Sequence, residues 1–176
     1  MNTRLFDASQ RRQVRRAAAR AESLTAGFYC IPGREWPRFP YDISTLAHGA
    51  GPDAPVFADV VRMVPDGAGG AADPRVDSAA QRRAKRDHYR IRLRDDEILS
   101  AVDDRTDLRL FPLLLYVLTH ELIHVVRFES GTALAPYDAP DPEARCVEES
   151  RVHAITRQVL RPAGTPWLRR VERLYS

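Results

Sequence analysis

The sequence predicts an α+β domain that is mainly helical and carries a small, mostly antiparallel sheet. Apolar residues recur at helical spacing near both ends of the chain, whereas three short segments between residues 41 and 94 have the apolar pattern of strands. A chain of 176 residues that is 44% hydrophobic and 29% charged suits one core. We therefore expect a single domain over residues 1–176.

Capping residues define the first helix. Asp7 and Gln10 have the spacing of a capping box, and we expect a helix from there to about Ala26 that ends at Gly27. Its arginine-rich face is expected to be solvated.

The next third of the chain contains strands and breakers. Residues 28–55 include five prolines, which favour extended irregular structure, with a short strand at Tyr41–Leu46. A second strand is expected at Val56–Val64. The segment from Pro65 to Ala84 is rich in Gly and Ala and is expected to be a mobile excursion, and His48 is expected to lie in a loop.

The third strand is the clearest one. His88–Arg94 alternates apolar and basic residues, which is the period-two pattern of a half-exposed strand. The helices that follow are expected to be a short one capped by Asp95 or Asp96, one after Asp107, one at Pro142–Leu160 with Asp141 as N-cap, and one at Trp167–Tyr175.

Charge and composition give little support to several classes of function. The net charge is +3 and the basic residues are scattered, so nucleic-acid binding is not indicated. No run of eighteen apolar residues and no signal-peptide pattern occurs, which predicts a cytoplasmic protein without a membrane partner. Cys30 and Cys146 do not form a metal-binding pair and are expected to be small buried hydrophobes. No pattern fixes the oligomeric state.

The segment His120-Glu121-Leu122-Ile123-His124 carries the chemistry. It has the H-E-x-x-H pattern of zinc hydrolases, in which two histidines four residues apart share one helix face and can bind one metal ion. Glu121 beside them would be the general base.

The helix that contains this motif is unusual in its polarity. From Leu113 to Val126 the only ionisable side chains are those of the motif and Tyr116, so the helix should be buried nearly all round. Buried imidazoles and carboxylates need partners or a cation. A bound Zn²⁺ would provide a partner for both histidines.

The segment Thr119–Val126 resembles the active-site helix of the zincin metallopeptidases. The resemblance covers this helix and, more weakly, the next one. It implies a zincin-like fold, a bound zinc ion, Glu121 as the catalytic base and a peptide or protein substrate. In zincins an edge strand pairs with the substrate, and His88–Arg94 could do so by β-augmentation, although an ordinary solvated strand is the favoured interpretation.

The third ligand distinguishes the zincin subclasses. Metzincin-like proteins have Gly and His three and six residues after the second histidine, where this chain has Arg127 and Ser130, so that subclass is excluded. The segment from Gly131 to Tyr137 is similar to the motif of aspartate-ligated zincins, but Leu134 replaces the metal-binding Asp, and we interpret the segment as a loop.

The chain is most similar to the glutamate-ligated zincins, or gluzincins, which carry E-x-x-x-D on a downstream helix. Glu149 matches the ligand position and His153 stands where Asp is usual. His153 could therefore be a ligand, or a hydrogen-bond donor to a reacting oxyanion. Glu148 is the second candidate for the third ligand, and Glu143 is the third.

Other assignments remain open at this level. Tyr137 or His153 could stabilise the oxyanion. Glu121 with His124 is also half of a di-iron motif, to which Glu148, Glu149 and His153 could add ligands, although a second E-x-x-H is missing. A zincin fold without peptidase activity, acting as a metal-binding or regulatory module, is the other alternative.

Overall fold

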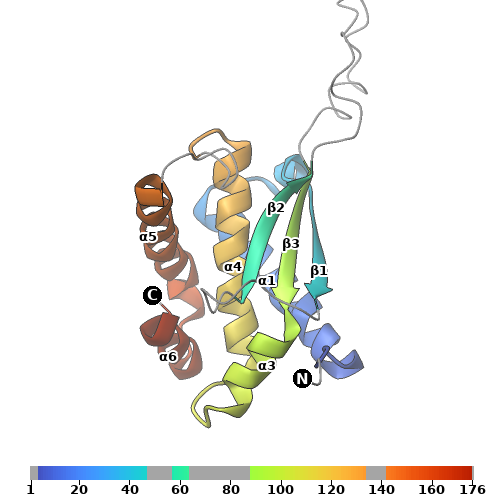
Figure 1. The fold of residues 1–176 in the computed structure, drawn as a ribbon. Helices are drawn as coiled ribbons and strands as arrows, with labels where there is room; N and C mark the ends of the chain where they lie inside the picture. The colour runs from blue at the N-terminus through green and yellow to red at the C-terminus, as the bar shows by residue number, and fades with distance from the viewer. Residues whose placement is uncertain (1–3, 47–56, 64–87, 134–141, 176) are drawn as a thin grey trace, which may run out of the picture.

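The structure is a computed structural model that describes residues 4–46, 57–63, 88–133 and 142–175. It confirms the α+β class, since it is mostly helical and has a small three-stranded sheet (Figure 1). In chain order the elements are α1 (Ala8–Phe28), the 3₁₀ helix η1 (Gly33–Arg38), β1 (Tyr41–Leu46), β2 (Ala58–Met63), β3 (His88–Arg94), α3 (Asp95–Asp103), α4 (Leu110–Glu129), α5 (Pro142–Leu160), the 3₁₀ helix η2 (Arg161–Ala163) and α6 (Pro166–Tyr175). The expected mobile segment, His48 and Asp141 lie outside the described residues.

The first helix begins as predicted and ends two residues later than predicted. The Asp7 carboxylate accepts the Gln10 N–H and the Gln10 side chain accepts the Asp7 N–H, which completes the capping box. At the other end, Cys30 has a positive φ of 54°, and the Ile31 N–H donates to the Ala26 carbonyl at 2.8 Å. This is the hydrogen bonding of a Schellman motif, so Cys30 rather than Gly27 ends the helix.

Two further expectations are wrong. Cys30 and Cys146 are both exposed rather than buried. The proline-rich segment after α1 is not extended throughout, because residues 33–38 form η1 with Pro37 inside it. Trp36 and Phe39 pack together there, with ring centroids 5.7 Å apart.

The sheet is mixed rather than mostly antiparallel. Its strand order is β1-β3-β2, with β3 parallel to β1 and antiparallel to β2. As predicted from its alternation, β3 buries Tyr89, Ile91 and Leu93 on one face. Its basic face bonds to the neighbouring strands, because Arg90 binds Asp42 and Arg92 binds Asp59 at directly paired positions.

The central position of β3 rules out the possibility that this strand pairs with a peptide and leaves the interpretation as an ordinary strand. Both of its edges already bond to other strands, so β3 has no free edge for β-augmentation. Within the described residues, the edge strands are β1 and β2, and β2 is the strand that packs against α4.

Helix α4 is the core of the molecule. It packs against α1, α5, α6 and β2, and every residue from Leu113 to Arg127 is buried, as its sequence predicts (Figure 1). By length and composition alone α4 is apolar enough to cross a membrane, but 83% of its most apolar stretch is buried inside the fold. That burial is typical of a core helix.

The remaining helices follow the predicted order with small differences. Arg94, not Asp95 or Asp96, is the N-cap residue of α3. The Asp95 carboxylate is instead buried and accepts the Phe6 N–H at 2.8 Å, and burial raises the pKa of this carboxyl to about 6. Helix α5 has the predicted bounds and buries Val152, Thr156, Val159 and Leu160.

Candidate metal centre

Helix α4 brings the two motif histidines together. His120 and His124 lie one turn apart on the same face, and their Nε2 atoms are 3.2 Å from each other. Both rings are buried among the apolar residues of the core. Two ring nitrogens at this distance need a proton or a cation between them, because two lone pairs or two N–H groups would repel.

Glu149 on α5 completes a cluster with these two rings. One carboxylate oxygen lies 3.2 Å from His120 Nε2 and the other lies 3.2 Å from His124 Nε2. These three groups form the candidate metal-binding cluster found among the described residues. Ligand atoms bound to a tetrahedral Zn²⁺ at about 2.0 to 2.1 Å are about 3.3 Å apart. The donor set and its spacing therefore fit one zinc ion.

The electrostatics of the cluster favour neutral His120 beside an ionised carboxylate. Burial lowers the pKa of His120 to about 4, although the hydrogen bond to Glu149 opposes the shift. Burial acts in the same direction on His124, but Glu149 and Glu121 outweigh it and raise the pKa of that ring. The hydrogen bonds from both rings hold the pKa of Glu149 well below its usual range despite partial burial. A neutral imidazole and a carboxylate are the forms that bind zinc.

Glu121 lies beside the cluster without joining it. It comes from the same turn of α4, is 6% exposed, and makes no ion pair with an Arg or Lys among the described residues. Burial, together with the nearby negative charges of Glu149 and Asp59, raises its pKa to about 7. A carboxylate with this pKa can exchange a proton near neutral pH, which is what a general base requires.

Glu148, the second candidate ligand, lies outside the cluster. Arg127 holds its carboxylate through two hydrogen bonds, of 2.5 and 2.8 Å. The pair is buried between α4 and α5, with side chains only 10% and 16% exposed. This bidentate contact holds α5 against α4 next to Glu149. Glu143, the third candidate, is an exposed residue in the first turn of α5 and is not part of the cluster.

His153, one turn after Glu149, is also not part of the cluster, but its ring lies beside that of His120, with centroids 4.6 Å apart. Tyr116 Oη donates to the Tyr175 carbonyl oxygen at 3.0 Å, so its oxygen accepts the proton of His153 Nδ1 at 2.9 Å. Burial lowers the pKa of His153, which favours the neutral ring. A neutral ring with its proton on Nδ1 has a lone pair on Nε2 and can accept a proton there.

Sequence reasoning missed the part that Tyr116 plays. The sequence feature that could have indicated this role is the position of Tyr116 in an otherwise apolar run. It stands four residues before His120 and therefore on the same helix face. Burial raises the pKa of Tyr116 to about 12, so it remains a neutral hydrogen-bonding group. Tyr137, the other predicted oxyanion group, lies outside the described residues.

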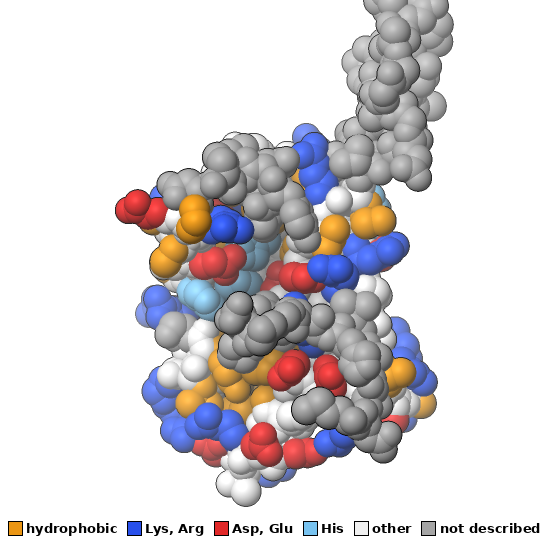
Figure 2. Space-filling view, viewed as in Figure 1, with side chains coloured by type: hydrophobic (Ala, Val, Ile, Leu, Met, Phe, Trp, Pro, Cys, Tyr) orange, Lys and Arg blue, Asp and Glu red, His pale blue; other side chains and the backbone are white. Residues whose placement is uncertain are grey.

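The cluster opens into a cleft of about 640 Å³ between β2, α4, α5 and the end of α6. Figure 2 shows histidine side chains at the surface of this face with acidic side chains beside them. Apolar side chains from β2 and α4 form much of the remaining wall, among them Val60, Val117 and Phe128. The cleft thus combines a polar centre with apolar walls, as substrate sites commonly do.

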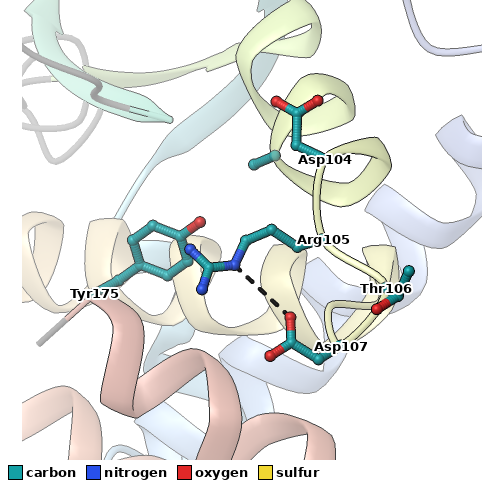
Figure 3. A pocket seen from close by; sticks show the side chains of 6 residues that line it. Asp104, Arg105, Thr106, Asp107 and Tyr175 are labelled. Atoms are coloured by element: carbon teal, nitrogen blue, oxygen red, sulfur yellow. Dashed lines mark ion pairs between the residues drawn. The ribbon is translucent and has the colours of Figure 1, made fainter.

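Tyr175 lines both this cleft and a second, more polar pocket. Its ring packs edge-on against Phe57 in the cleft, with centroids 4.9 Å apart, and its other side lines the pocket (Figure 3). Arg105 lies between Tyr175 and Asp107 in this pocket and pairs with Asp107 at 3.7 Å. Asp107 also pairs with Arg170 of α6. These contacts hold the end of α6 in place, where the Tyr175 carbonyl accepts the hydrogen bond from Tyr116.

Comparisons with protein-family models, with curated proteins and with solved structures find no match. The function of the site is therefore inferred from its own geometry.

Proposed function

We propose that the protein is a zinc-dependent metallopeptidase of the gluzincin type, with His120, His124 and Glu149 as zinc ligands. One observation carries the proposal. A helical His pair and a carboxylate from a second helix converge with ligand atoms 3.2 Å apart, and a buried carboxylate with a raised pKa lies beside them. One cluster of three groups suits a single ion better than a di-iron centre, which needs a second E-x-x-H.

Bound zinc would polarise the substrate carbonyl and lower the pKa of a water molecule towards about 7. Glu121 would take a proton from the attacking water and deliver it to the leaving amine. Its burial supports this role, because the raised pKa of about 7 balances proton uptake against proton release. The neutral His153 ring, held by Tyr116, offers a second proton acceptor at Nε2.

A peptide substrate is supported by the position of β2. This strand is an edge of the described sheet and also lines the cleft, so an extended peptide added to its free edge would lie alongside His120 and Glu121. The apolar cleft walls favour hydrophobic side chains next to the bond that is cleaved.

Peptide hydrolysis by zinc-loaded protein tests the proposal. A mixture of unfolded proteins and peptides is incubated with wild type, Glu121→Gln and, as a matched control, Glu97→Gln, which changes an exposed carboxylate on α3. We expect cleavage by wild type and Glu97→Gln and none by Glu121→Gln, although all three bind zinc. Cleavage by Glu121→Gln at the wild-type rate would refute the mechanism. Failure of zinc-loaded wild type to cleave any substrate would favour a non-catalytic metal-binding or regulatory module.

A further inference from the structure

Helix α1 presents a row of positive charge that the described structure does not neutralise. Five of its arginines are exposed, and none forms an ion pair with a described residue; they are Arg11, Arg12, Arg15, Arg16 and Arg20. Like charges four residues apart disfavour a helix, and cations near its N-terminus oppose the helix dipole. Among the described residues, the Asp95 carboxylate near Arg11 offsets part of this charge.

Two of these arginines border an apolar groove. Arg16 and Arg20 line one side of a space of about 580 Å³ between α1 and α6, and its floor includes Phe111 and Leu115 of α4. None of the residues that line this groove is acidic. The groove shares no lining residue with the cleft at the candidate metal centre.

Aromatic rings hold the guanidinium groups at both sides of the groove. The Arg16 guanidinium lies over the Phe111 ring, 5.6 Å from its centroid, and that of Arg109 lies over Trp167 at 4.8 Å. Trp167 is nevertheless 42% exposed, which is high for a tryptophan. Stacking orders the guanidinium planes before binding and leaves their N–H groups available for carboxylates.

We propose that this groove binds an acidic amphipathic helix of a partner protein. Apolar side chains of that helix would enter the groove, and carboxylates four residues apart would face Arg16 and Arg20, which are separated by one helical turn of about 6 Å. A nucleic acid fits less well, because guanidinium groups already cover the aromatic faces on which bases would stack and the floor is aliphatic as well as aromatic.

A labelled synthetic helix tests this inference. The probe is a fluorescent helical peptide of about 18 residues with a leucine stripe flanked by glutamates, titrated with the full-length protein at physiological salt. Matched peptides carry Gln for every Glu, or Ser for every Leu. The protein variants are Arg16→Gln/Arg20→Gln and, as a control, Arg11→Gln/Arg15→Gln, which removes the same charge from the side of α1 that lines a different pocket.

Saturable binding of the acidic leucine peptide is expected, with tenfold weaker binding or more after Arg16→Gln/Arg20→Gln and less than a twofold change in the control. Both altered peptides should bind at least tenfold more weakly. Trp167→Phe provides a second measurement. Peptide binding should change the tryptophan emission of the wild type but not that of this variant, whose remaining emission comes from Trp36. Equal losses in both arginine variants, no binding, or displacement of the peptide by a single-stranded oligonucleotide of equal charge would overturn the proposal.

Discussion

The carboxylates of the sheet and those between α4 and α5 differ in their partners. In the sheet, each carboxylate on the basic face has a guanidinium directly opposite it, as in Asp42–Arg90 and Asp59–Arg92. At the α4–α5 interface, no Arg or Lys among the described residues pairs with Glu121 or Glu149. The difference separates a region where guanidinium groups balance the carboxylates from a region where histidine rings lie beside them.

The same contrast occurs within α5 between two adjacent residues. Glu148 is balanced by buried Arg127, whereas Glu149 pairs with the two histidine rings and with no Arg or Lys among the described residues. Adjacent carboxylates on one helix turn thus serve different purposes. Glu148 holds the helices together, and Glu149 faces the candidate metal centre.

The largest effects are expected when either of these two carboxylates is replaced by an amide. Glu149→Gln should weaken zinc binding by roughly tenfold or more. Glu148→Gln should lower the free energy of unfolding of the metal-free protein by about 2 to 4 kcal/mol, because it leaves Arg127 buried and unpaired, and should affect zinc binding less. Zinc competition titrations and urea unfolding of both variants measure the two effects. The reverse order of zinc affinities would transfer the ligand role to Glu148.

The next effect concerns the unpaired charge of Glu121. Burial raises its pKa from 4.5 to about 7 in the folded, metal-free protein. The folded state therefore holds the proton more tightly than the unfolded state, and stability falls as the pH rises from 4.5 to 7. The loss is complete above pH 7 and amounts to about 3 kcal/mol.

Glu121→Gln should remove this pH dependence. The variant should gain stability over metal-free wild type as the pH is raised from 4.5 to 8, because Gln never carries the buried charge. Urea unfolding at several pH values measures the difference between the two proteins. A difference that stays constant over this range would mean that Glu121 is already neutralised in the fold.

The smallest effect is expected in the sheet. Arg90→Gln breaks the pair with Asp42, but the two side chains are 41% and 40% exposed, so water replaces most of the interaction. The urea midpoint should change little, and zinc affinity should change less than twofold. A loss of zinc binding in this variant would show that the two regions are coupled, contrary to the comparison above.

The parts of the molecule that could be predicted from sequence are those that depend on local rules. The capping box at Asp7, the bounds of α5 and the common face of His120 and His124 follow from helical geometry within a few residues. The buried character of α4 follows from its composition. These features needed no knowledge of the rest of the fold.

The errors and omissions concern contacts between distant segments. The central position of β3 depends on which strands pair with it, and its alternation is the same at the centre or at an edge. Arg127, 21 residues before Glu148 in the chain, binds the Glu148 carboxylate and so leaves Glu149 as the carboxylate beside the two histidines. Tyr116 acquires its role from His153 and Tyr175, 37 and 59 residues away. The periodicity of apolar residues in a sequence gives no information on contacts between segments far apart in the chain.

The zinc content of the purified protein tests the central claim most directly. Wild-type protein is prepared without added metal, then dialysed against zinc, and its metals are measured by elemental analysis beside His120→Ala and His124→Ala. We expect about one zinc per wild-type chain, and roughly a hundredfold weaker binding or none in either variant, because each ring supplies one of three protein ligands. Wild-type protein that takes up no zinc, or that contains two iron ions per chain, would contradict the account.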